Sequence, residues 1–261
     1  MKELWVPLSG AIAQQQKVDT IANNVANANT PGFKKDQLAF KEYLTALDKG
    51  TQDIDLPNKE WAPEDFYRSY GAEHAMVKVD GSYTNFKQGT LSPTSNPLDI
   101  GLRGKGFLTI DTPKGIRYTR RGTLSLRQDG ILTTQEGYPV IGRDDNEPIA
   151  IPPGTKNITI ALDGAVYANN NQVGALNIAE FNDIHALRKE GNSLFVNNNE
   201  GNLKEQTNTS IHQGFVEQSN VNAVSEMSDL IKAHRHFDSI QKAIKTYDSI
   251  SSKAVNEMIK F

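Results

Sequence analysis

The chain has 261 residues, of which 37% are hydrophobic, enough for a packed core of ordinary size. Its 28 basic and 31 acidic residues give a net charge of -3, which excludes the strongly basic surface typical of proteins that bind nucleic acid. The absence of cysteine excludes disulfides, thiolate metal sites and a cysteine nucleophile.

The N-terminal region has no pattern of a cleaved secretory signal. Gln14, Gln15, Gln16 and Asp19 interrupt it where a signal peptide needs an apolar stretch, and no run of about 18 apolar residues occurs anywhere in the chain. We therefore expect no membrane span, and export, if it occurs, by a route that reads an uncleaved N-terminus.

Residues 4–26 predict an amphipathic helix. Small or apolar residues recur there at steps of three and four, with Gln15 the one polar interruption, and the stripe is narrow, as in a coiled-coil seam. The helix is expected to end at the turn-forming run 27–32, which contains Asn, Pro and Gly. Four apolar residues lie in or beside the stripe, Leu8, Ile12, Val18 and Val25, and a helical stripe taken alone is more often part of a core than of an interface.

The middle of the chain has a different pattern. Residues 36–76 are polar and broken by Pro57 and Pro63, which we interpret as an extended connector. Residues 77–215 alternate apolar and polar positions between short Gly, Asn and Pro breaks, and two Asp-Gly pairs, at 129–130 and 163–164, predict hairpin turns. This pattern predicts a central all-β domain of antiparallel hairpins that folds without the helices.

A second helical period begins near Val221 and continues to the end of the chain without Gly or Pro. Because this helix would be much longer than the first, part of its apolar stripe would lack an intramolecular partner. Six of its residues are predicted to pack between subunits: Met227, Ile231, Phe237, Ile240, Ile244 and Tyr247. The predicted fold class is α+β, with segments 1–35, 36–76, 77–215 and 216–261 and the two terminal helices forming a coiled-coil-like stalk.

No motif in the chain indicates catalysis or metal binding. The glycines at 101, 104 and 106 lack the spacing of a dinucleotide loop and precede a strand, so we expect a tight turn. His234 and His236 are two residues apart, which puts them on different sides of a helix. The acidic run 144–147 lacks the spacing of an EF-hand and is interpreted as an exposed turn. We expect no catalytic residue, cofactor or metal.

The run 22–34 resembles the N-terminal signature of the flagellar rod and hook family, and 95–107, 118–122, 137–142 and 213–237 also resemble that family. The signature positions in this chain are Ala22, Asn23, Asn24, Ala26, Asn27, Thr30, Gly32 and Phe33. The resemblance implies a structural subunit of the bacterial flagellar basal-body rod, exported through the flagellar type III apparatus. Its terminal helices would pack against copies of itself and other rod and hook proteins in a periplasm-spanning tube, with the β-domain outside them. Together with the narrow width and the terminal position of the two stripes, the resemblance predicts that the four residues of the first stripe and the six of the second pack between subunits.

Within that family the length suits the distal-rod type, whereas residues 227–231 and 245–258 resemble the proximal-rod type, which we favour. The distal-rod type and a hook subunit remain alternatives. Two hypotheses from other classes are a β-rich surface binding module, which would leave the helical stripes unexplained, and a cell-wall hydrolase, whose carboxylate pair would be invisible in sequence.

Overall fold

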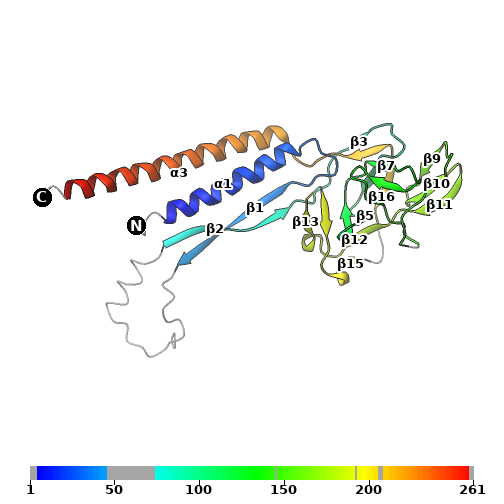
Figure 1. Cartoon of the computed structure of the whole chain (residues 1–261), viewed down its shortest axis with the longest axis horizontal. Coiled ribbons are helices and arrows are strands. Elements are labelled where there is room, and N and C mark those ends of the chain that lie inside the picture. The colour runs from blue at the N-terminus through cyan, green and yellow to red at the C-terminus, as the bar shows by residue number, and fades with distance from the viewer. Residues whose placement is uncertain (1–4, 46–73, 145, 192, 205–207, 259–261) are drawn as a thin grey trace, which may run out of the picture. The chain divides into compact units, whose positions relative to one another are not determined.

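The computed structural model describes residues 5–45, 74–144, 146–191, 193–204 and 208–258. Within these ranges a helix near each end of the chain accompanies a central antiparallel β-region, which confirms the predicted α+β class (Figure 1). The chain divides into two compact units, described here one at a time. The first comprises Met1–Asn23, Gln37–Tyr83 and Val224–Phe261, and the second comprises Asn24–Asp36 and Thr84–Ala223.

Helix α1 spans Trp5–Ala26, as the stripe predicted. Pro7 is tolerated because it lies in the first turn, where its missing N–H has no intrahelical acceptor. Ala11, Val18 and Ile21 are buried, at the steps of seven and three that place them on one side of a helix. The helix ends where Asn27 begins a series of turns.

Helix α3 spans Ala223–Met258, 36 residues, or about 54 Å at 1.5 Å per residue. In the first unit, the Gln14 side-chain amide donates to the Ala233 carbonyl oxygen at 3.3 Å, so α1 and α3 lie side by side (Figure 1). Six buried or half-buried residues of α3 follow steps of three and four: Glu226, Leu230, Ala233, Phe237, Ile240 and Ile244.

Strands β1 (Asp36–Thr45) and β2 (His74–Thr84) form a two-stranded sheet. The interpretation of 36–76 as a connector therefore needs correction at both of its ends, and the expected boundary at 77 falls inside β2. Local pattern could not reveal this pairing because the two strands are separated by 28 residues, 46–73, which lie outside the described residues. In the first unit, the Val77 amide donates to the Ser9 hydroxyl at 3.3 Å, which attaches β2 to α1.

The second unit is built around a six-stranded sheet, counted over the described residues, in the order β13–β14–β6–β5–β12–β15. Every pairing in it is antiparallel. Its strands are β5 (Phe107–Thr112), β6 (Gly115–Thr119), β12 (Ile178–Phe181), β13 (Arg188–Glu190), β14 (Leu194–Val196) and β15 (Leu203–Lys204). Two 3-10 turns, Ile184–Ala186 and Glu200–Asn202, precede β13 and β15.

Smaller antiparallel pairs surround this sheet, including the two predicted hairpins. β7 (Leu124–Leu126) pairs with β8 (Leu132–Thr134), and β9 (Ile158–Ile160) pairs with β10 (Ala165–Ala168). Gly130 and Gly164 supply the positive φ, 83° and 94°, that these turns require. The remaining strands are β11 (Asn171–Ala175), paired with β10; β4 (Ile100–Arg103), paired with β16 (Ser210–Gln213); and β3 (Leu91–Pro93), paired with β17 (Phe215–Glu217).

Strand β5 has apolar side chains buried on both of its faces. Leu108 and Ile110 join one cluster of aliphatic residues, whereas Phe107 on the other face joins Tyr118, Phe181 and Phe195. Because both faces are covered, β5 is apolar at consecutive positions instead of alternating. Gly101 lies within β4, and Gly104 and Gly106 lie in its connection to β5, so that motif leads from strand to strand and not to a helix.

Candidate assembly surface and signature turn

The structure places the ten residues predicted to pack between subunits in two different environments. Val18 is buried, and Val25, Phe237, Ile240 and Ile244 are half-buried within the chain. The other five are exposed: Leu8, Ile12, Met227, Ile231 and Tyr247. Of the ten predicted residues, only these five are available to a neighbouring subunit. The available apolar surface is thus narrower than the stripes that the sequence predicted.

The exposed residues near the start of α3 form a compact apolar face. Val224, Met227 and Ile231 recur at steps of three and four, on a different side of the helix from Phe237 and Ile244. Ile231 keeps 56% of its side chain exposed. We call these three residues the α3 outer face. A sequence stripe could not separate this face from the inner one, because both contain apolar residues at helical spacing.

Helix α1 has a smaller exposed apolar surface, formed by Leu8 and Ile12 one turn apart. Ile12 is 54% exposed, while Ala11 beside it is buried. We call this pair the α1 outer face. Isolated exposed apolar residues are common in soluble proteins, but apolar faces on two helices of one chain are the kind of surface that a partner covers.

The signature residues divide between the outside of α1 and a compact turn that follows it. Ala22, Asn23 and Ala26 are exposed on the helix, whereas Asn24, Gly32 and Phe33 are buried in the second unit. The Thr30 hydroxyl donates to the Asn27 side-chain oxygen at 3.1 Å, and the Gly32 amide donates to the Glu217 carbonyl at 2.7 Å. The turn is therefore held by contacts within its own chain.

Different features of the structure explain the glycine at position 32 and the phenylalanine at position 33. Gly32 has a φ of 70°, and a Cβ on it would lie 2.5 Å from the Arg121 backbone nitrogen, so only glycine fits. Phe33 is buried, and the Lys189 ammonium lies 3.8 Å from the centre of its ring. That distance is within the range of a cation–π interaction.

Behind the turn lies a buried ionic cluster that the sequence reasoning did not assign. Glu217 accepts from the Lys34 ammonium at 2.6 Å and the Gly89 amide at 2.8 Å through one oxygen. Its other oxygen accepts from Arg120 Nε at 2.9 Å and lies 2.7 Å from Arg120 Nη2. Arg120 also donates to the Gly106 carbonyl. We call Lys34, Arg120 and Glu217 the Glu217 cluster.

Burial governs the electrostatics of this cluster. It lowers the pKa of Lys34, while the Glu217 carboxylate opposes that shift, and it lowers the pKa of Arg120 in the same way. All three residues occur in the sequence blocks that resemble the flagellar family. That resemblance is the only feature of the sequence that could have pointed to them. Their spacing along the chain gives no indication that they meet.

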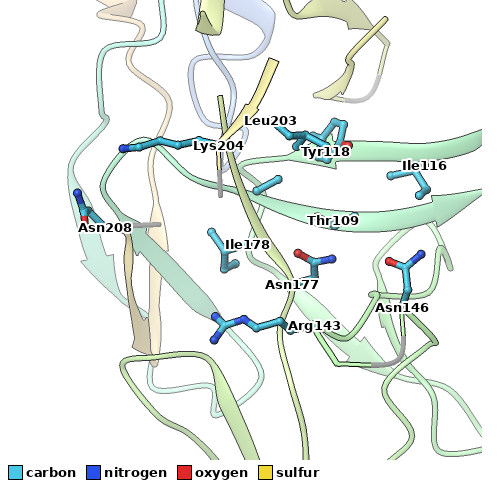
Figure 2. Close-up of a pocket in the computed structure, with 11 residues that line it drawn as sticks. Thr109, Ile116, Tyr118, Arg143, Asn146, Asn177, Ile178, Leu203, Lys204 and Asn208 are labelled. Atoms are coloured by element: carbon cyan, nitrogen blue, oxygen red, sulfur yellow. The ribbon is translucent and has the colours of Figure 1, made fainter. Parts of the chain in front are cut away.

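The β-domain also has a polar cavity of about 610 Å³ (Figure 2). Strands β5 and β6 contribute Thr109, Ile116 and Tyr118, and Arg143 and Asn177 also line it. Lys204 lines it too, but its charge is matched by Glu180 at 3.4 Å. Among the described residues that line it there is no His, Asp or Glu, so these residues offer no paired acid and base.

Within the residues that the structure describes, two kinds of feature are absent, a cluster of metal ligands and a helix able to span a membrane. No group of three or more His, Asp or Glu side chains there is arranged to hold a metal ion. Over the same ranges, neither α1 nor α3 combines the length and apolar character that crossing a bilayer requires.

A chain with a β-domain and with exposed apolar faces on its helices is suited to packing against other subunits. Comparison with known proteins agrees: the chain belongs to the flagellar basal-body rod protein family. Residues 6–34 match the family model "Flagella basal body rod protein", residues 101–168 match "Flagellar hook protein FlgE/F/G D1 domain", and residues 212–257 match "Flagellar basal body rod FlgEFG protein C-terminal".

Relatives align over nearly the whole chain. The flagellar basal-body rod protein FlgF of Caulobacter vibrioides is 32% identical, covering 98% of each chain. The rod protein FlgG of Buchnera aphidicola subsp. Schizaphis graminum is 32% identical over 96% of this chain and 97% of that protein. The hook-basal body complex protein FlhO of Bacillus subtilis is 30% identical over 100% and 99%.

These matches confirm the prediction of a structural rod subunit at the flagellar basal body, of the FlgF type. The Caulobacter FlgF alignment spans 257 positions for 98% of this chain, so it places almost no gaps in this chain. The Buchnera FlgG alignment spans 268 positions for 96% of the chain, so it needs insertions. Chain length suggested the distal-rod type, but it is a weaker indicator of the type of rod protein than the alignment.

Proposed function

We propose that this subunit polymerises through the α1 and α3 outer faces into the axial rod, together with copies of itself and other rod and hook proteins. The observation that carries the proposal is the exposure of Ile12 and Ile231 on helices whose other apolar faces are already buried. Burying each isoleucine would contribute about 1.5 to 3 kcal/mol per contact. Repetition around and along a tube would sum these contributions.

The half-buried stripe on α3 supports a second element of the proposal. Phe237, Ile240 and Ile244 face inward at the heptad-like steps of a coiled-coil seam, and the Gln14 side chain reaches α3 at Ala233. We propose that the helices pack as a coiled-coil-like stalk whose outer faces contact neighbouring subunits. The chain acts as a structural part and not as an enzyme.

Export is the third element. We propose that the flagellar type III apparatus exports the chain, because the chain belongs to the rod protein family. The assembled rod would span the periplasm.

The test is a pair of charge substitutions in the full chain, Ile12→Glu and Ile231→Glu. A carboxylate at a contact that excludes water costs several kcal/mol, so we expect both variants to be lost from isolated basal bodies and the cells to be non-motile. Thermal unfolding of the β-domain should stay unchanged, because neither residue belongs to the second unit.

Ser239→Glu is the matched control, since it adds the same charge at an exposed position of α3 beyond the outer face. We expect it to assemble normally. Ile244 is a poorer choice for the test because it is half-buried within the chain. Wild-type levels of either isoleucine variant in rods would place the polymerisation interface elsewhere.

A further inference from the structure

The chain crosses between its two units four times, between residues 23 and 24, 36 and 37, 83 and 84, and 223 and 224. The residues of the second unit that stand at the first three crossings are Asn24, Asp36 and Thr84. The fourth follows Asn220 by three residues. These positions are far apart in sequence, yet the second unit joins them through a single hydrogen-bonded group.

Asp36 connects the first three crossings. Its backbone amide donates to the Asn24 side-chain oxygen at 3.0 Å, and its carbonyl accepts from the Asn24 side-chain nitrogen at 2.8 Å. One carboxylate oxygen of Asp36 accepts from the Thr84 hydroxyl at 2.8 Å. The Asn24 side-chain amide thus pairs with the Asp36 backbone as a neighbouring strand would, because it offers one donor and one acceptor to the carbonyl and amide of that residue.

Asn220 connects the fourth crossing to the residues beside Asp36 and Thr84. Its side-chain oxygen accepts from the Lys35 amide at 2.8 Å, and its side-chain nitrogen donates to the Asn85 carbonyl at 2.7 Å. The Asn85 amide in turn donates to the Lys35 carbonyl at 2.8 Å. The residues next to Asp36 and Thr84 are therefore tied together and to the segment that leads into α3.

Lys189 of β13 completes the group from the β-domain. Its ammonium lies 2.8 Å from the second carboxylate oxygen of Asp36 and 2.8 Å from the Lys34 carbonyl. The Asp36 and Lys189 side chains are only 13% and 16% exposed, so water screens this ion pair weakly. We call Asn24, Asp36, Thr84, Lys189 and Asn220 the junction cluster.

We propose that Asp36 is a positioning residue for rod assembly, acting through the junction cluster to hold the four crossing chains at fixed spacing on the β-domain. Four chains fixed at one place on the β-domain keep a constant spacing there, whereas four independent linkers would each rotate about their own backbone bonds. The assembly consequence rests on the proposed function, but the spacing itself is a property of the isolated subunit.

The first measurement is hydrogen exchange, followed by mass spectrometry, on the purified full chain carrying Asp36→Ala. We expect the peptides covering 32–36 and 84–89 to exchange about tenfold faster, because they contain the Lys35 and Asn85 amides held by the cluster. Core peptides containing Leu132 and Ile149 should be unchanged. Asp111→Ala is the matched control: Asp111 is an exposed aspartate of β5 whose carboxylate makes no hydrogen bond within the described residues.

The second measurement is incorporation into basal bodies of cells that produce each variant. Asp36→Ala should reduce incorporation at least tenfold while the melting temperature of the β-domain stays within a few degrees of wild type, and Asp111→Ala should incorporate normally. If Asp36→Ala fails to fold, Lys189→Met removes the buried cation alone and should show the same two effects more weakly.

Either of two results overturns the proposal: unchanged exchange at 32–36 and 84–89, or faster exchange with normal incorporation. The Ile12→Glu variant separates this outcome from failure of the proposed function. If Ile12→Glu is excluded from rods and Asp36→Ala is not, the outer-face interface stands and the junction cluster has no role in assembly.

Discussion

The Lys34 ammonium lies 2.6 Å from the Glu217 carboxylate, with their side chains 2% and 0% exposed, although the two residue numbers differ by 183. This contact attaches the turn after α1 to the last strand before α3. A buried ion pair adds little net stability relative to apolar residues of the same shape, but removing one partner is expensive. The Glu217 cluster should therefore be sensitive to single substitutions.

We expect Glu217→Gln to lower the free energy of unfolding by about 3 to 5 kcal/mol, because Lys34 and Arg120 then stay buried without a counter-charge. Lys34→Met should cost less, since Glu217 keeps both contacts with Arg120. Urea unfolding followed by circular dichroism measures both. Glu190→Gln is the control: Glu190 pairs with Arg117 at a more exposed place and should change stability little. Equal effects of Glu217→Gln and Glu190→Gln would contradict this account.

Gly32→Ala should destabilise the chain for two reasons, the positive φ of 70° and the contact of the new Cβ with the Arg121 backbone. Gly137→Ala provides the comparison, because Gly137 has a φ of 88° and open space around its Cβ position. Backbone strain alone costs about 1 to 2 kcal/mol. Thermal unfolding should show a clearly larger loss for Gly32→Ala, and similar losses would mean that the turn yields to the added methyl group.

Glu180 should make the stability of the β-domain depend on pH. Burial alone would raise its pKa, but hydrogen bonds from the Thr209 hydroxyl and the Asn208 amide, together with Lys204, hold the pKa below its ordinary 4.5. A carboxyl with a lowered folded-state pKa contributes stability above the unfolded-state pKa, and that contribution is lost as pH falls through the folded-state pKa. The difference in unfolding free energy between wild type and Glu180→Gln should therefore be largest above pH 5 and shrink progressively below pH 4.5. A difference that does not vary with pH would exclude this role for Glu180.

The β-domain fragment is the fourth prediction. Residues 77–215 were expected to fold alone, but that fragment ends inside β17 and omits Glu217, which leaves Arg120 buried without its carboxylate. We expect a 77–222 fragment to be more stable by about 3 to 5 kcal/mol, from the restored charge pair. Urea titrations of the two fragments decide this, with dispersed amide resonances as the check on folding. Fragments of equal stability would show that β17 and Glu217 are dispensable.

The sequence by itself determined the elements whose signals are local. Both helices follow from apolar spacing over consecutive turns, and the two Asp-Gly hairpins follow from a turn chemistry contained in a few residues. The resemblance of 22–34 to the rod and hook signature gave the family for the same reason, because the signature is contiguous. None of these inferences needed to know which segments meet.

Tertiary structure decided everything that depends on which segments meet. A stripe on α3 predicts that apolar residues will be covered, but only the position of α1 distinguishes the inner Phe237 from the outer Ile231. The pairing of β1 with β2 and the meeting of Lys34, Arg120 and Glu217 are long-range contacts, so no local period records them. Asp36 looked like the start of a connector because hydrogen bonds to Asn24, Thr84 and Lys189 exist only after the chain has folded around it.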